Sequence, residues 1–412
     1  MRVAGGIIEA EKSGLSMDFS FTPEQEAFRM ELRQWLADNL DPDLRVYDAM
    51  DERVAASREV FEKRRAWQAK LYAAGWAGIA WPREYGGRGA GLIEQIIYNE
   101  EYARARAPIV PGYLGIGMCG PTLIQYGTEQ QKRRYVKRIL SGEDIWCQGY
   151  SEPNAGSDLA AIQTRAEDKG DYFLLNGQKV WTSAAQYADM MFLLARTDPA
   201  APKHKGISYL LLDMKSKGVQ VRPLVVASGH AHFNEVFFQD VEVPKENLVG
   251  PKNEGWRVAM TTLSYERAFV GGEGHAEAVR ALIELANRVE IEGAPAWQTP
   301  WVRQRLIALA IECQAAKYTQ LRSLTRQLRG LPPGPEGSML KLFGSELGVR
   351  IAHFATEMLG PYSQLGESMP LLPEAPRWQS RVISCLQFRI AGGTSEIQKN
   401  IIGERTLGLP KD

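Results

Sequence analysis

The stretches WCQGYSEPNAGSD at residues 146–158 and NGQKVWTS at residues 176–183 decide how the rest of this sequence is interpreted. The first is typical of a strand that runs into a loop of small and polar residues. The second is typical of a turn followed by a strand. Gly149, Gly156 and Gly177 allow backbone conformations and close approaches that a Cβ would prevent. From the residues alone, two interpretations stay open: a backbone-lined bed for a flat, phosphate-bearing ligand, or an ordinary loop that closes a sheet edge.

Both stretches closely resemble the flavin-binding signature of the acyl-CoA dehydrogenases. Two further segments resemble the same family in the same order, PREYGGRG at residues 82–89 and AGGTSEIQKNIIGER at residues 391–405. The resemblance extends from about Met17 to the end of the sequence. Several ordered motifs over that span are more specific than any one of them, so the ligand-binding interpretation is now favoured.

The composition excludes several classes of protein. The 412 residues allow two or three domains, and 49 basic residues against 49 acidic ones give no reason to expect nucleic acid or an anionic membrane as a partner. No apolar run is long enough to span a bilayer, and the first sixteen residues lack the features of a secretory signal. The cysteines are widely spaced, which predicts reduced, buried thiols in a cytoplasmic protein and neither disulfides nor a metal site.

The periodicity divides the chain into three domains and predicts an α+β multidomain fold. Residues 1–17 are an extension, either disordered or the result of a start assigned too far upstream. Residues 18–146 are predicted to form an all-helical domain, residues 147–255 a compact antiparallel β-barrel or sandwich, and residues 256–412 a four-helix bundle. The resemblance implies the same order of domains.

Local signals place the individual elements. Thr22 with Gln25, and Thr128 with Gln131, match the capping box at a helix start. Asn176-Gly177 predicts a type I′ hairpin between two strands. The helices are expected at residues 54–74, 92–106, 256–288, 301–328, 336–358 and 377–408, besides the two that begin at the capping boxes. The strands are expected at residues 164–167, 172–175, 178–181, 190–196, 207–213, 219–224 and 234–243.

The resemblance implies an FAD-dependent enzyme that dehydrogenates an acyl-CoA thioester between its α and β carbons. A base removes the α-proton while the β-hydride passes to flavin N5, and electrons leave to an electron-transferring flavoprotein. The residues that match the family's flavin contacts are Gln148, Gly149, Tyr150, Ser151, Trp181, Thr182, Ser183, Thr394, Ser395 and Glu396. Those that match substrate contacts are Ser157, Ser264, Arg267 and Gly393.

Three of these assignments have a purely structural alternative. Trp181 alone would be interpreted as a core aromatic residue of a strand. Thr394 or Ser395 would cap a helix, which is compatible with a ligand contact. Arg267 could instead form an ion pair within the bundle.

The catalytic base has a different position from that in many family members, which carry it as Glu in a Tyr-Glu-Gly-Thr run. Here Gly392 occupies that place and cannot remove a proton. A branch of the family carries the base on the first helix of the bundle, just before an Arg, and this sequence has Glu266 there. Leu263, Glu266 and Val270 share a helical stripe, and a carboxylate on an apolar face has a raised pKa that suits a base. The alternative is a surface glutamate paired with Arg267.

Two further departures concern the contacts that complete the flavin site from a neighbouring subunit. The family's Arg-x-x-Phe-Gly segment is not evident, and residues 290–300 (EIEGAPAWQTP) stand in its place. The later glycine-rich loop is altered at residues 359–362. Both a homotetramer and a heterotetramer with a related subunit are therefore considered. Two rival functions stay open, a non-catalytic partner subunit and a flavin oxidase. The space left by Gly392 favours a branched or bulky acyl group.

Overall fold

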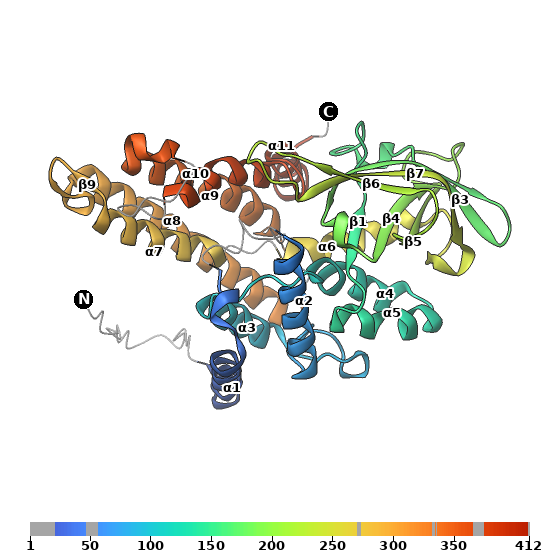
Figure 1. Cartoon of the computed structure of the whole chain (residues 1–412), viewed down its shortest axis with the longest axis horizontal. Helices are drawn as coiled ribbons and strands as arrows, with labels where there is room; N and C mark the ends of the chain where they lie inside the picture. The colour runs from blue at the N-terminus through green and yellow to red at the C-terminus, as the bar shows by residue number, and fades with distance from the viewer. Residues whose placement is uncertain are drawn as a thin grey trace.

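The computed structural model describes residues 21–46, 57–269, 273–331, 334, 336–365 and 375–410, except for the side chains of residues 266–269 and 273. The predicted extension at residues 1–17 lies outside this part. The chain forms an N-terminal helical region, a middle β-sheet region and a set of C-terminal helices, as the sequence predicts (Figure 1). Among the described helices, none combines the length and apolar character that crossing a membrane requires.

The N-terminal region begins where the capping signals predict. The Thr22 hydroxyl accepts a hydrogen bond from Gln25 N, and the Gln25 side-chain oxygen accepts one from Thr22 N. Thr128 and Gln131 form the same capping box. A π-helical turn at Gly115–Cys119 (η3) precedes α4. The helices are α1 (Pro23–Asn39), α2 (Arg58–Ala73), α3 (Leu92–Arg104), α4 (Gly120–Tyr126) and α5 (Glu129–Ser141).

The middle region is one mainly antiparallel sheet of eight described strands. They are β1 (Trp146–Gly149), β2 (Arg165–Asp168), β3 (Tyr172–Ser183), β4 (Met190–Arg196), β5 (Ile207–Asp213), β6 (Val219–Leu224), β7 (Phe233–Pro244) and β8 (Leu248–Val249). Their order is β6-β7-β3-β2-β4-β5-β8, and β1 pairs with β4. Two pairings are parallel, β1 with β4 and β2 with β4, which the fully antiparallel prediction did not include.

The predicted hairpin at Asn176-Gly177 is wrong. β3 continues from Tyr172 to Ser183 through both residues, and β7 follows it along most of that length. The register shifts between Leu175 and Gly177, so the dipeptide marks a bulge. Gly177 has φ +148°, and a Cβ there would lie 2.5 Å from Thr164 Oγ1, which explains why glycine occupies this position in the strand.

The C-terminal helices are α6 (Gly255–Phe269), α7 (Glu273–Arg288), α8 (Pro300–Leu328), α9 (Glu336–Leu359), α10 (Ala375–Ser384) and α11 (Ser395–Ile401). The single helix predicted at residues 256–288 is therefore two helices. The one predicted at residues 377–408 is also divided, because Gly392 and Gly393 have φ of +65° and +92°. A small hairpin, β9 (Glu290–Ile291) and β10 (Ala294–Pro295), separates α7 from α8.

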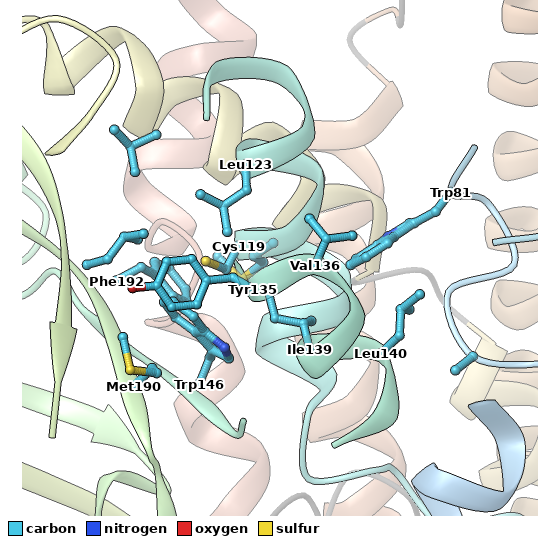
Figure 2. Packing of buried hydrophobic residues seen from close by; sticks show 14 of the residues in the cluster. Trp81, Cys119, Leu123, Tyr135, Val136, Ile139, Leu140, Trp146, Met190 and Phe192 are labelled. Carbon is cyan, nitrogen blue, oxygen red and sulfur yellow. The ribbon is translucent and has the colours of Figure 1, made fainter. Parts of the chain in front are cut away.

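The run of apolar residues in β4 explains how the sheet is held. Phe192 and Leu194 pack into the cluster formed with the N-terminal helices, whereas Met191 and Leu193 pack into a second cluster on the other face. A strand buried on both faces needs such an unbroken run. Figure 2 shows the first cluster, in which Tyr135 meets Trp146 edge-on at a centroid separation of 5.2 Å. All four cysteines are free and buried, as predicted.

Candidate flavin site

The two halves of the signature lie side by side. Val180 N donates to Ser151 O at 3.0 Å, and the Nζ atom of Lys179 donates to Tyr150 O at 3.0 Å. These bonds join the end of β1 and its following loop to the last third of β3. The structure therefore places Tyr150 and Ser151 next to Lys179 and Val180, which directly precede Trp181 in β3.

Trp181 is not a core residue. Its side chain is 56% exposed, and its backbone has φ +61°, an unfavourable conformation for a residue with a large side chain. The register of β3 against β7 shifts between Lys179 and Thr182, so a second bulge turns the indole outward. The ring packs edge-on against Phe233 at 5.7 Å and leaves its remaining surface available.

The residues beside Trp181 differ in what they can offer a ligand. Thr182 is fully buried, and its hydroxyl has no hydrogen-bond partner among the described residues. Ser183 is only half-buried, so its hydroxyl is the more accessible of the two. Asn234 lies beneath them and donates from Nδ2 to Thr182 O at 3.0 Å, which fixes the end of the strand.

The loop has both buried and exposed positions: Tyr150 and Glu152 are buried, whereas residues 153, 154 and 156–158 are exposed. A Cβ at Gly149 would lie 2.4 Å from Met191 Sδ and 2.9 Å from Leu193 Cβ, so close strand packing requires this glycine. The Tyr150 ring is buried, edge-on to Phe192 at 5.9 Å. Gly149 and Tyr150 can therefore present only their backbone groups to a ligand. Gln148 and Ser151 can also present their half-buried side chains. Ser157 is exposed farther along the loop.

The C-terminal turn before α11 is held from within the bundle. Thr394 Oγ1 accepts from Ile397 N at 3.1 Å, which confirms the predicted helix cap. Ser395 is buried and donates to Glu346 Oε1 at 3.0 Å, so its hydroxyl is engaged inside the protein. Glu396 is exposed. The sequence did not single out the residues that fix this turn: Lys341 donates to Gly393 O, and Gln398 donates to Gly392 O.

The helix that carries Glu266 lies where the three regions meet. α6 contacts β4 and β5 of the sheet, η3 and α4 of the N-terminal region, and α9 of the bundle. Thr262, on its buried face, forms a hydrogen bond of 2.9 Å with Thr122 of α4. The Ser264 hydroxyl donates to Thr261 O at 2.7 Å. The side chains of Glu266 and Arg267, predicted as base and substrate contact, lie outside the described part.

The residues that stand where the resemblance places the family's inter-subunit segment begin with a short hairpin. At residues 290–295, β9 and β10 pair through a two-residue turn in which Glu292 has φ +56° and Gly293 has φ +79°. Two consecutive positive φ values are typical of a type I′ turn. This hairpin lies at the end of the helical bundle far from the sheet (Figure 1). The altered loop at residues 359–362 lies at the junction of α9 with a 3-10 turn at Gly360–Gln364.

A buried ion pair links the loop to β3, and no local pattern in the sequence predicts that its two members pair. Lys179 Nζ lies 2.8 Å from Glu152 Oε1, and both side chains are buried. Burial lowers the pKa of Lys179 to about 8, although Glu152 opposes this. Burial raises the pKa of Glu152, but Lys179 and the hydrogen bonds from Gln163 and Thr164 outweigh it and keep this pKa below its ordinary value.

The described residues contain no group of His, Cys, Asp and Glu side chains that could hold a metal ion. A cavity of about 550 Å³ lies between α1 and the end of α3, lined by Arg33, Arg45, Arg104 and Arg106 above an apolar floor. None of the predicted flavin residues lines it.

Three models of one protein family match this chain along most of its length. The N-terminal, middle and C-terminal domain models of acyl-CoA dehydrogenase match residues 22–143, 147–241 and 253–407. The chain is 40% identical to acyl-CoA dehydrogenase IpdE1 of Mycobacterium tuberculosis, over 94% of this chain and 98% of that protein.

Two solved structures are also similar. A chain of the ChsE4-ChsE5 complex from Mycobacterium tuberculosis matches with a TM-score of 0.83 at 34% identity, over 96% of this chain and all of that one. A chain of the Tcur3481-Tcur3483 steroid ACAD matches with a TM-score of 0.82 at 30% identity, with the same coverage.

Proposed function

Because this chain belongs to the acyl-CoA dehydrogenase family, and is therefore an oxidoreductase acting on acyl-CoA, we propose that it binds FAD and uses Glu266 as its base. The observation that carries this proposal is the outward-facing Trp181 beside the loop at residues 148–151. An indole in a strained backbone conformation that makes one edge-on contact with Phe233 and leaves more than half of its surface exposed beside a backbone-lined loop is typical of a binding site.

The residues present fit a flavin. The exposed face of Trp181 supplies a flat apolar surface, the loop supplies backbone donors and acceptors, and Ser183 supplies a hydroxyl. Gln148 and Ser151 add side-chain polar groups. From the C-terminal turn, Thr394 and Glu396 remain candidates for the nucleotide part, whereas Ser395 contributes to the turn's internal structure.

The chemistry assigned to the chain's own residues is proton removal. The proton on the α-carbon of a thioester is weakly acidic, so the base must act in a partly desolvated site, with donors placed to stabilise the enolate oxygen. Bound FAD supplies the hydride acceptor. Glu266 lies on α6, one turn after the buried Thr262, where sheet, N-terminal helices and bundle converge. Gly392 cannot perform this role, which leaves Glu266 as the candidate.

The acyl group and the partners are proposed from two observations. Gly392 adds no side chain to its turn, and one similar structure is that of a steroid dehydrogenase, so we assign a branched or polycyclic acyl thioester as substrate. The β9–β10 hairpin replaces the family's inter-subunit flavin contact, and both similar structures contain two different chains. This supports a tetramer with a related subunit over a homotetramer. The electron acceptor is an electron-transferring flavoprotein, as the family resemblance implies.

An anaerobic titration of the purified chain with CoA thioesters tests the function. The chain expressed alone is expected to be yellow, and bulky acyl thioesters are expected to bleach the visible flavin band. Bleaching by straight-chain thioesters alone would contradict the assigned substrate. A colourless protein that becomes active only with a related subunit would favour the non-catalytic partner role. Stoichiometric peroxide formation in air would favour an oxidase.

A further inference from the structure

The buried pair formed by Lys179 and Glu152 contacts both halves of the flavin signature. Lys179 belongs to β3, two residues before Trp181, and is fully buried. Its Nζ atom donates to Tyr150 O at 3.0 Å and to Glu152 Oε1 at 2.8 Å. One ammonium group thus binds the backbone of the loop and the carboxylate that follows it.

The carboxylate of Glu152 organises the rest of the loop. It accepts from Gln163 N at 2.6 Å and from Thr164 N at 2.9 Å, at the point where the chain re-enters the sheet. The backbone of Glu152 also exchanges two hydrogen bonds of 3.0 Å with Ala155, which closes the turn in between. Every described hydrogen-bond partner of this side chain is therefore either Lys179 or a group at the far end of the same loop, and Arg196 of β4 adds an electrostatic attraction.

Stability alone is a weak reason for such a pair. Desolvating two charges costs about as much as their attraction returns, and packed apolar residues of equal volume do as well or better. What the charges add here is geometry, because their bonds fix the carbonyl of residue 150 relative to the strand that carries residue 181. The loop at residue 150 presents backbone groups to a ligand, and the strand at residue 181 presents the indole.

We propose that Lys179 and Glu152 act together as positioning residues for the flavin, holding the loop at residues 148–155 in register with Trp181. This inference rests on the proposed function, since it concerns the same cofactor. The pair is neutral as a whole. Removing one member leaves the charge of the other without its partner. Reduction adds negative charge to a flavin. The carboxylate of Glu152 that remains when Lys179 is replaced therefore disfavours reduction and lowers the flavin midpoint potential.

The test uses Lys179→Met, Glu152→Gln and the double variant, each purified as the full chain. The matched control is Lys203→Met, because Lys203 pairs with Asp158 of the same loop at an exposed site. Three quantities are measured: the FAD dissociation constant of the apoprotein, the midpoint potential of the bound flavin, and the thermal unfolding temperature without FAD.

Lys179→Met and Glu152→Gln are each expected to weaken FAD binding about tenfold or more, since breaking a buried pair leaves an unmatched group at the loop. Lys179→Met is also expected to lower the midpoint potential, and the double variant to restore the potential but not the affinity. Lys203→Met should change neither quantity. If Lys179→Met does not fold, Glu152→Gln carries the affinity test.

Other results would overturn the inference. A lowered unfolding temperature with unchanged FAD affinity and potential in both single variants would show a purely structural pair. An effect of Lys203→Met equal to that of Lys179→Met would show a general loss of charge. If the unaltered chain binds no FAD, both this inference and the proposed function fail, whereas normal binding by the unaltered chain and both single variants refutes the inference alone.

Discussion

The outward position of the Trp181 side chain depends on how β3 pairs with β7. Strict alternation along a strand would place this side chain in the core. The bulge between Lys179 and Thr182 shifts that alternation and turns the indole outward. Bulges depend on pairing with a distant strand, so a local pattern does not reveal them. The same holds for the Lys179–Glu152 pair, whose members lie 27 residues apart.

Gly149 and Gly156 belong to the same loop but have different surroundings. A Cβ at Gly149 would meet Met191 and Leu193, whereas one at Gly156 would meet nothing within 4 Å. Gly149→Ala is therefore expected to lower the free energy of unfolding by about 1–3 kcal/mol through overpacking, and to weaken FAD binding by displacing β1. Gly156→Ala is the control and should leave unfolding unchanged. Equal effects in urea unfolding would contradict this account.

His275 of α7 is one residue whose titration should influence stability near neutral pH. Burial, with a smaller contribution from the charge of Arg350, lowers its pKa to about 4 against the opposing effect of a backbone hydrogen bond with Gly344. Its Nδ1 atom is buried without a hydrogen-bond partner among the described residues. The folded chain therefore binds this proton more weakly than the unfolded chain does, and stability falls as the pH drops from about 6.5 to about 4.

Urea unfolding of the wild-type chain across this pH range measures the effect. The contribution of His275 is expected to reach up to about 3 kcal/mol at the acidic end. His275→Gln removes the titrating group and should flatten that part of the profile. Parallel profiles for the two proteins would refute the assignment to His275.

At the scale of elements, local chemistry predicted the ends of helices and strands well. Both capping boxes are present, and β4, β5 and β6 have the predicted bounds. The errors arise where a local signal has two structural uses. An Asn-Gly dipeptide can form either a hairpin turn or a bulge. Here β3 pairs with β7 on both sides of the dipeptide, so it forms a bulge. The parallel pairing of β1 with β4 joins segments more than 40 residues apart, which no short pattern encodes.

The two capping boxes provide a comparison between a local and a long-range role. Gln131 closes the box of α5 and also donates from Nε2 to Glu246 O and Leu248 O, next to the sheet. Gln25 closes the exposed box of α1 and has no such additional bonds among the described contacts. Gln131→Ala is expected to cost roughly 2 kcal/mol of unfolding free energy, and Gln25→Ala about 0.5 kcal/mol. Equal costs in denaturant unfolding would show that the link to the sheet is unimportant.

At the scale of the whole molecule, the order of the three regions followed from the change in hydrophobic period. Their mutual arrangement did not, because it depends on contacts such as those of α6 with sheet, N-terminal helices and α9. The assembly state is likewise not encoded in any one motif. α8 nevertheless carries exposed Ile307, Ile311 and Tyr318 at helical spacing, and such an apolar row is typical of an interface.

We expect this row to contribute to the proposed tetramer. Ile311→Asp places a charge in the row and should reduce the mass of the assembly measured by light scattering, with or without a related subunit. Met30→Asp, at an exposed apolar position of α1, is the control and should leave the mass unchanged. An unchanged mass for Ile311→Asp would exclude this face of α8 from the interface.

The central claim is that one carboxylate on α6 removes the substrate's α-proton, and a single-turnover experiment tests it most directly. Anaerobic flavin reduction by a bulky acyl-CoA is followed in wild-type protein, in Glu266→Gln, and in Glu254→Gln, whose side chain pairs with Arg257 at the exposed start of the same helix. We predict that Glu266→Gln keeps its FAD but slows reduction by about a hundredfold or more, while Glu254→Gln matches wild type. Undiminished reduction in Glu266→Gln would contradict the claim.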